Sequence, residues 1–288
     1  MKISGFTFIR NGLKLDYPFI EAIKSILPIC DEMIIVVGNS DDGTKEAILA
    51  LDEPKIKIIE TVWDENLRVG GKILAQQTDI ALQHITGDWG FYLQGDEVIH
   101  EQYLSTVKKA MEDYVDQPEV QGLLFRYKHF YGSYDYIGDN RKWYRREIRV
   151  VRNNIGVSSY RDAQGFRINN KKLRVKFIDA EIYHYGWVRD PRAQQLKNKN
   201  FLRLWHDDQW MAEKVSDADE VDYNVLEYLA KFEGTHPSVL TERLKRMNWK
   251  FNYDPNLKKP QTFKEMLSNF IEKRTGYRFG EYRNYKII

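Results

Sequence analysis

The stretch Gly87-Asp88-Trp89-Gly90-Phe91-Tyr92-Leu93-Gln94-Gly95-Asp96-Glu97 joins an apolar, aromatic segment directly to two carboxylates. Strand interiors are poor in Asp and Glu, because burying an unpaired charge is costly. Open α/β sheets place their chemistry at the carboxyl ends of strands. The stretch therefore predicts a strand at 89–93 whose acidic end meets a hard cation and, behind it, a phosphate. An ordinary loop whose acids cap a helix beginning near His100 is the alternative.

Strands alternate with helices before this stretch. Apolar strands are expected at 3–10, 33–37 and 55–60, and a longer helix at 72–86. Such alternation predicts right-handed crossovers, a mainly parallel sheet and the α/β class. Residues 1–118 are thus expected to form the first half of one α/β domain.

The regular alternation of strands and helices ends at about residue 118. Strands are expected at 120–130, 147–152 and 174–184, followed by a helix at 191–206. We expect residues 119–206 to form an α+β half packed on the first, and residues 207–288 to form a helical C-terminal extension.

Composition excludes several classes of protein. The 288 residues suffice for one large α/β domain with an appendage, and 42% apolar residues permit a core. A net charge of +2 gives no case for nucleic-acid binding. Cys30 is the single cysteine, which excludes an intramolecular disulfide and fits a reducing compartment. We see no signal peptide and no apolar run near the roughly 20 residues of a spanning helix, so we expect a cytoplasmic protein.

Two loops follow the early strands. Arg10-Asn11 closes the first and Gly38–Thr44 closes the second. Neighbouring parallel strands would place both loops beside Gln94–Glu97. Main-chain N–H groups and the side chains of Asn39, Ser40 and Asp42 suit a nucleoside with its phosphates. A plain turn with a helix cap is the alternative for the second loop.

The order of these elements resembles glycosyltransferase family 2. The most specific pieces are Ser40-Asp41-Asp42-Gly43-Thr44 and the stretch 87–97, and the resemblance covers roughly residues 3–205. It implies a GT-A fold, a nucleotide-diphosphate sugar donor and a divalent cation, Mg²⁺ or Mn²⁺. It also implies that residues 1–118 are the nucleotide-sugar-binding half and that residues 119–206 of the same domain receive the acceptor and complete the metal site. The branch it resembles most transfers sugars, often in lipopolysaccharide core assembly, so hexosyl or heptosyl transfer in cell-envelope polysaccharide biosynthesis is expected.

The resemblance also assigns roles to residues at the predicted site. It places the metal on Asp96 and on His184 of Ile182–Trp187, although a His among aromatics can equally be a core residue. Asn39 stands where the family has acidic residues, and Gln94 begins the family's Asp-x-Asp, so we expect Gln94 and Gly95 to contact the sugar or ribose. Arg68 and Lys72 would face the diphosphate, with helix-surface charge as the alternative.

Sugar transfer by direct displacement needs a base that accepts the proton of the acceptor hydroxyl. The family places an acid between the core strands and the metal-binding His. Asp162, in Tyr160–Gly165, is the best-placed carboxylate, and Asp139 is its rival. A surface pair of Arg161 with Asp162 is the alternative.

These observations predict an inverting, metal-dependent glycosyltransferase that acts on a saccharide or lipid-linked saccharide. A nucleotidyltransferase and a non-catalytic nucleotide- or carbohydrate-binding protein are the rivals, the second supported by Gln94 and the missing loop acids. Segment 242–288 carries 12 Lys and Arg against 5 Asp and Glu. That charge favours a solvated helical tail, while peripheral contact with the inner face of the cell membrane would suit a lipid-linked acceptor.

Overall fold

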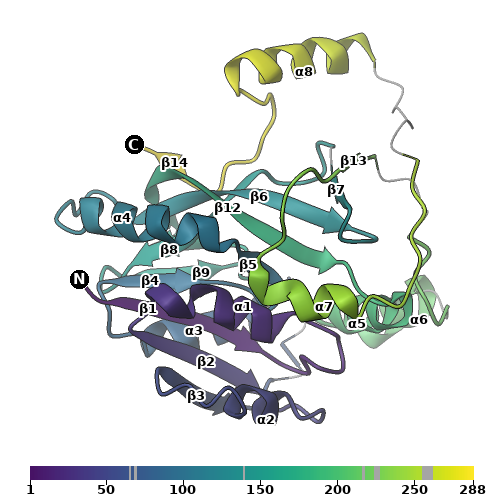
Figure 1. Ribbon diagram of the computed structural model, residues 1–288, viewed down its shortest axis with the longest axis horizontal. Helices are drawn as coiled ribbons and strands as arrows, with labels where there is room; N and C mark the ends of the chain where they lie inside the picture. The colour runs from purple at the N-terminus through teal and green to yellow at the C-terminus, as the bar shows by residue number, and fades with distance from the viewer. Residues whose placement is uncertain (65, 68–69, 139, 216–217, 224–227, 255–261) are drawn as a thin grey trace.

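Four neighbouring parallel strands form the part of the sheet that carries the site. The computed structural model describes residues 1–64, 66–67, 70–138, 140–215, 218–223, 228–254 and 262–288 (Figure 1). The four strands lie in the order β3-β2-β1-β4. Their bounds are Ile3–Ile9 for β1, Glu32–Gly38 for β2, Ile56–Thr61 for β3 and Trp89–Tyr92 for β4. Their carboxyl ends therefore meet at one edge, and the predicted α/β class is confirmed.

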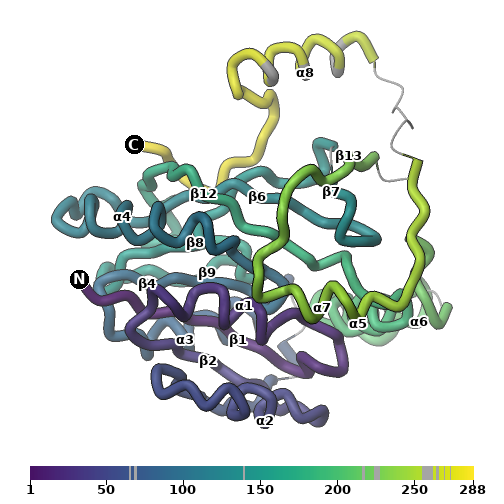
Figure 2. Tube along the Cα trace, viewed as in Figure 1, coloured from purple at the N-terminus to yellow at the C-terminus, as the bar shows by residue number. Residues whose placement is uncertain are grey.

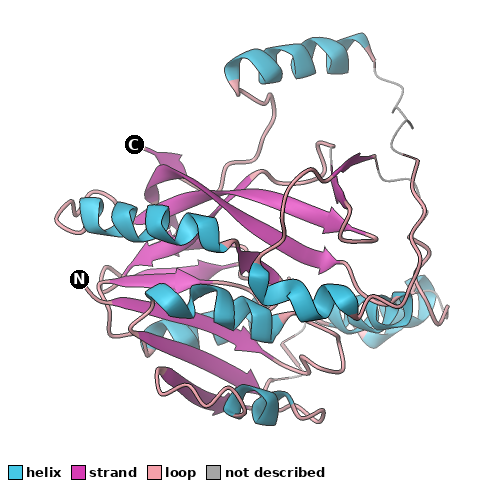
Figure 3. Ribbon diagram, viewed as in Figure 1, coloured by secondary structure: helices cyan, strands magenta, loops and turns pink. Residues whose placement is uncertain are grey.

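The sheet has an apolar surface on both sides. Along β2, Met33, Ile35 and Val37 point to one face, while Ile34 and Val36 point to the other. This period of two explains why the strand reads as a continuous apolar run. Helices α1 (Phe19–Ile26) and α4 (Leu104–Tyr114) cover the first face and α3 (Lys72–Gln83) covers the second (Figure 3).

The second half of the chain extends the sheet with longer strands. β8 pairs antiparallel with β4, β6 lies next to β8, and β12 lies parallel to β6. The short strand β5 pairs antiparallel with β12. The bounds are Glu97–Ile99 for β5, Gly122–Tyr131 for β6, Tyr136–Gly138 for β7, Arg146–Arg152 for β8 and Arg174–Trp187 for β12. A separate sheet consists of β9 (Val157–Tyr160), β10 (Gly165–Ile168) and β11 (Lys171–Lys172).

The last eighty residues mix helices with short strands. β13 pairs with β7, and β14 pairs with the beginning of β12, so the chain end returns to the sheet (Figure 2). Helix α8 stands apart from the sheet (Figure 1). The bounds are Thr44–Leu49 for α2, Pro191–Arg203 for α5, Asp208–Lys214 for α6, Thr241–Lys245 for α7, Phe263–Thr275 for α8, Leu229–Lys231 for β13 and Lys286–Ile287 for β14. None of the helices in the described ranges is long and apolar enough to cross a membrane.

Candidate functional site

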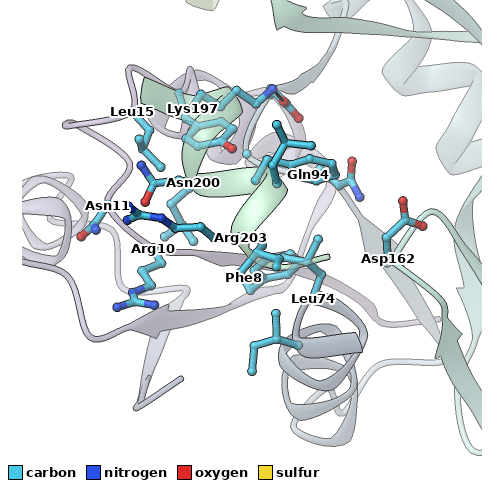
Figure 4. Close-up of a pocket in the computed structure, with 18 of the residues that line it drawn as sticks. Phe8, Arg10, Asn11, Leu15, Leu74, Gln94, Asp162, Lys197, Asn200 and Arg203 are labelled. Atoms are coloured by element: carbon cyan, nitrogen blue, oxygen red, sulfur yellow. Dashed lines mark hydrogen bonds and ion pairs between the residues drawn. The ribbon is translucent and has the colours of Figure 1, made fainter. Parts of the chain in front are cut away.

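A cavity of about 810 Å³ lies at the carboxyl ends of β1 and β4 (Figure 4). The end of α5 forms another part of its wall. Gln94 and Asp162 lie on one side of the cavity, opposite Arg10 and Asn11. The predicted site residues that line it are Arg10, Asn11, Gln94, Gly95, Asp96, Asp162 and His184. The structure thus brings together residues from both halves of the chain.

Asp96 and His184 lie side by side in this cavity. His184 Nε2 is 3.8 Å from Asp96 Oδ1. The pairing of β5 with β12 sets this distance, because the register places His184 opposite Glu97. The main-chain N–H of Tyr185 also donates to the carbonyl of Asp96 at 2.8 Å. Sheet pairing therefore joins two residues that are far apart in the sequence.

A second histidine fixes the proton on His184. His129 Nε2 lies 2.8 Å from the carbonyl of Tyr144, which can only accept, so Nε2 carries a proton. Burial holds the pKa of His129 well below its usual value, and the nearby His184 adds to that effect. The neutral His129 therefore has an unprotonated Nδ1, 2.9 Å from His184 Nδ1. His184 must donate from Nδ1, which leaves its Nε2 as a lone pair facing Asp96.

A buried lysine forms an ion pair with the other carboxylate oxygen of Asp96. Lys197 Nζ lies 3.0 Å from Asp96 Oδ2 and also donates to the carbonyl of Gly186 at 2.8 Å. Burial lowers the pKa of Lys197 to about 8, and the fully buried Arg189 contributes to the same shift. Burial opposes the charge on Asp96, but Lys197, His184 and Arg189 outweigh it and hold its pKa well below the usual range. Asp96 is thus a carboxylate at neutral pH.

The space between Asp96 and His184 suits a cation. A Cβ at Gly186 would lie 2.5 Å from His184 Nε2 and 3.1 Å from Asp96 Oδ2, so the missing side chain keeps that space open. A carboxylate oxygen and an imidazole lone pair are ligands that Mn²⁺ and Mg²⁺ accept. Within the described residues, no group of three or more His, Cys, Asp and Glu is arranged to hold a metal. Asp96 and His184 would thus supply two ligands, and a cation held there would need its remaining ligands from outside the described residues.

Glu97, the second acid of the 87–97 stretch, has a structural role. Glu97 and Arg149 are both fully buried, and Arg149 Nε and Nη2 each donate to the Glu97 carboxylate at 2.7 Å. Glu97 also accepts a bond from the main-chain N–H of Gln94 at 3.1 Å. A bidentate pair of this kind holds the 94–97 turn rigidly. Of the two adjacent acids, Asp96 alone lines the cavity.

Glu147 predicts a specific pH dependence of stability. Burial raises its pKa from 4.5 to about 7, Glu97 adds to the shift and Arg149 opposes it. Between these two pKa values the folded chain holds a proton that the unfolded chain has lost, so stability falls as the pH rises. The free energy of unfolding should decrease by up to about 3 kcal/mol across this window on account of Glu147.

Glu147→Gln should remove that dependence, because an amide does not titrate and still accepts the bond from Gln164 Nε2 (3.1 Å). Denaturant unfolding of both proteins near pH 5 and near pH 8 tests this. The variant should gain stability relative to the wild type only at the higher pH. An equal difference at both pH values would show that Glu147 does not titrate in this window.

Asp162 sits in a strained loop between β9 and β10. Its neighbours Arg161 and Ala163 have φ of 58° and 64°, a region that such residues seldom adopt. The loop is held by Gln94 Nε2, which donates to the carbonyl of Ala163 at 3.3 Å. A Cβ at Gly71 would lie 2.8 Å from Asp162 Cβ, so the start of α3 also packs closely on it. Burial raises the pKa of Asp162, which makes its carboxylate a better proton acceptor.

The predicted nucleotide loop is tied to the end of β1. Ser40 Oγ accepts a hydrogen bond from the main-chain N–H of Asn11 at 2.9 Å. Asp42 Oδ2 accepts one from the main-chain N–H of Lys14, in the β1–α1 loop, at 2.7 Å. Asn39 Oδ1 accepts from the main-chain N–H of Trp63 at 3.2 Å. Asn39, Ser40 and Asp42 do not line the cavity within the described residues. Their side chains shape the loop that carries Arg10 and Asn11.

Three predicted residues remain to be placed. Lys72 lines a second hollow beside β9, together with Tyr160 and Arg161, and is not part of the cavity that holds Asp96. Arg68 and Asp139 lie outside the described residues.

Sequence reasoning missed several residues that build the site. Gly186 and His129 act on the Asp96–His184 pair, and Arg149 holds Glu97. Asn200 and Arg203, from the last turn of α5, also line the cavity. The one available signal was Gly186, a glycine two positions after His184 at the end of a strand, where a close approach is a common reason for glycine.

Comparison with known proteins identifies a family. A model of the family described as "Glycosyl transferase family 2" matches residues 18–174. No curated protein matches the chain. Among solved structures, S. aureus TarS 1-349 in complex with UDP-GlcNAc is similar at 22% identity and a TM-score of 0.34, over 46% of this chain and 36% of that one. The crystal structure of S. aureus TarS is similar at 16% identity and a TM-score of 0.38, over 69% and 39% respectively. The chain therefore covers well under two thirds of either TarS chain.

Proposed function

The chain belongs to glycosyl transferase family 2 and is a glycosyltransferase, and from this we propose an inverting enzyme that depends on Mg²⁺ or Mn²⁺. Its donor would be a nucleotide-diphosphate sugar and its acceptor a saccharide or lipid-linked saccharide. The observation that carries the proposal is the convergence of Asp96 and His184, 3.8 Å apart, in a cavity that also contains Asp162. The resemblance to lipopolysaccharide core transferases supports an acceptor from the cell envelope, reached from the cytoplasmic side.

Asp96 and His184 would hold the cation. Asp96 offers a charged oxygen, and the proton on Nδ1 leaves His184 Nε2 available as a ligand. When bound, the cation would neutralise the diphosphate as it leaves. Lys197, beside Asp96, adds a further positive charge at the same point. Arg10 and Arg203 face the cavity from β1 and α5 and suit the remaining phosphate oxygens.

Asp162 would act as the base. The acceptor hydroxyl oxygen forms a bond to the anomeric carbon while the bond from that carbon to the diphosphate oxygen breaks, and the hydroxyl proton passes to the Asp162 carboxylate. The attack comes from the face opposite the leaving group, so the configuration inverts. Charge develops on the sugar ring as in glycoside hydrolysis. The raised pKa of Asp162 favours its role as proton acceptor.

The three segments would divide this work. Residues 1–118 would bind the nucleotide-sugar, residues 119–206 would supply the base and the second metal ligand, and residues 207–288 would form an extension. Support for the first two assignments comes from the cavity, which takes Arg10 and Asp96 from one segment and Asp162 and His184 from the other.

Calorimetry with UDP, GDP and ADP, with and without MnCl₂, tests the proposal. We expect one of these nucleotides to bind with an affinity that Mn²⁺ increases, and its sugar conjugates to be consumed when an acceptor is added. Binding without turnover of any sugar conjugate would favour a non-catalytic binding protein, and release of pyrophosphate from a nucleoside triphosphate and a sugar phosphate would favour a nucleotidyltransferase. Absence of binding would contradict all three.

A further inference from the structure

Helix α8 carries an apolar stripe that faces solvent. Phe263, Met266, Leu267 and Phe270 have the spacing that places side chains on one face of a helix. Their exposed fractions are 80%, 57%, 50% and 56%. Single exposed apolar residues are ordinary, but four on one helix face form a contiguous patch that marks an interaction site.

The opposite, polar face of α8 holds the helix to the body of the protein. Ser268 accepts a hydrogen bond from Arg141 Nη1 at 2.7 Å. Glu272 accepts from Arg145 at 3.2 Å and from Arg278 at 2.8 Å. A helix on a globular protein normally buries its apolar stripe and exposes its polar side. Here the bonds from Arg141 and Arg145 orient α8 the other way, so that its apolar stripe faces solvent.

The charge around this stripe selects the kind of partner. Residues 262–288, which contain α8, carry 6 Lys and Arg against 3 Asp and Glu, a net charge of +3. The Arg274 guanidinium lies 4.9 Å from the centre of the Phe270 ring, at the border of the stripe. Exposed aromatic residues follow the helix at Tyr277, Phe279 and Tyr282. An apolar face with basic flanks and nearby aromatic rings has the chemistry of a helix that lies in an anionic membrane surface.

A second copy of the chain fits this face less well. A symmetric contact between two α8 helices would bring together two copies of residues 262–288, each of net charge +3. Like charges facing each other across an interface are unfavourable. An anionic bilayer offers apolar chains to the stripe and negative headgroups to the flanking cations, and so satisfies both features at once.

We propose that α8 docks the protein on an anionic membrane surface through Phe263, Met266, Leu267 and Phe270. Docking of this kind would serve the proposed function, because a lipid-linked acceptor would lie in the same membrane surface. The biological use of docking therefore rests on the proposed function. The contact is peripheral and reversible, since a helix of this kind lies in the interface and does not cross it.

Vesicle co-sedimentation of the full chain tests the docking. The wild type should bind vesicles of phosphatidylcholine with phosphatidylglycerol, bind pure phosphatidylcholine vesicles weakly, and release from the anionic vesicles as salt rises. Phe263→Ser combined with Phe270→Ser should lower the affinity for anionic vesicles at least about tenfold. Two rings that would insert into the bilayer are lost, while the charge stays the same. Leu49→Ser on α2, where Leu49 is 58% exposed, is the matched control and should bind like the wild type.

Several outcomes would overturn the proposal. The first is equal vesicle binding by the wild type and the double variant, and the second is no vesicle binding by the wild type. The third is a wild type that is a dimer in light scattering and does not bind vesicles, with a double variant that is a monomer. Calorimetry with UDP, GDP and ADP plus MnCl₂ on the same samples separates the two hypotheses. Nucleotide binding without vesicle binding refutes docking alone, and vesicle binding without nucleotide binding refutes only the proposed function.

Discussion

Replacing Asp96 with asparagine should abolish cation-dependent sugar transfer and leave the protein folded. The amide oxygen can still accept the bond from Lys197 Nζ, now 3.0 Å from Oδ2, so the buried lysine keeps a partner. A neutral amide is a much weaker ligand for Mn²⁺ than a carboxylate. We expect transfer to fall at least about a thousandfold, roughly 4 kcal/mol of transition-state stabilisation. Transfer assays and Mn²⁺ titration by calorimetry measure the two effects.

Gly186→Ala tests the same site without removing a ligand. The added methyl group would lie 2.5 Å from His184 Nε2, in the space between Asp96 and His184. It should weaken Mn²⁺ binding about as much as Asp96→Asn does. Asp113→Asn, on the exposed surface of α4, is the control and should keep wild-type binding. Wild-type Mn²⁺ affinity and rate in Asp96→Asn would rule out Asp96 as a ligand.

Asp162→Asn should spare donor binding and reduce transfer at least about a hundredfold, the usual scale for a general base. The active form is the carboxylate, so the wild-type rate should rise with pH through the raised pKa of Asp162 and then level off. The residual rate of the variant should not follow this acidic limb. Steady-state kinetics across pH, with donor affinity from calorimetry, provide the measurement.

Asp113→Asn again serves as the control, with an expected wild-type pH profile. An unchanged rate in Asp162→Asn would move the base to another acid, with Asp139 the next candidate. Loss of donor affinity together with rate would instead give Asp162 a part in binding.

The amino-acid sequence predicts the parallel half of the fold well. An apolar run such as 33–37 has few alternatives to a strand buried on both faces, and an acidic turn after 89–93 marks the functional edge. The cavity indeed contains Asp96, Gln94 and Asp162 from the predicted set. These are local patterns, and local patterns are what a single sequence records.

Local patterns do not record the pairing of distant segments, and only the family resemblance predicted that Asp96 and His184 share one site. His129 looks like any strand residue until β6 and β12 lie together and bring its ring against His184. The amphipathic pattern of α8 was visible, but the side that packs depends on Arg141 and Arg145, which are far away in the sequence. Periodicity identifies two faces of a helix and does not say which one the fold will bury.

The strand register that aligns His184 with Glu97 has a consequence for how this protein can diverge. A single-residue insertion in β12 before His184 would turn the imidazole to the far side of the sheet, and one in β5 would shift Glu97 out of register with it, so these strands tolerate substitution better than changes of length. The 161–163 turn connects two strands of a separate small sheet, so substitutions there other than at Asp162 need not disturb that alignment. Under the proposed function, acceptor preference could therefore be engineered in this turn while the strands that align Asp96 and His184 stay unchanged.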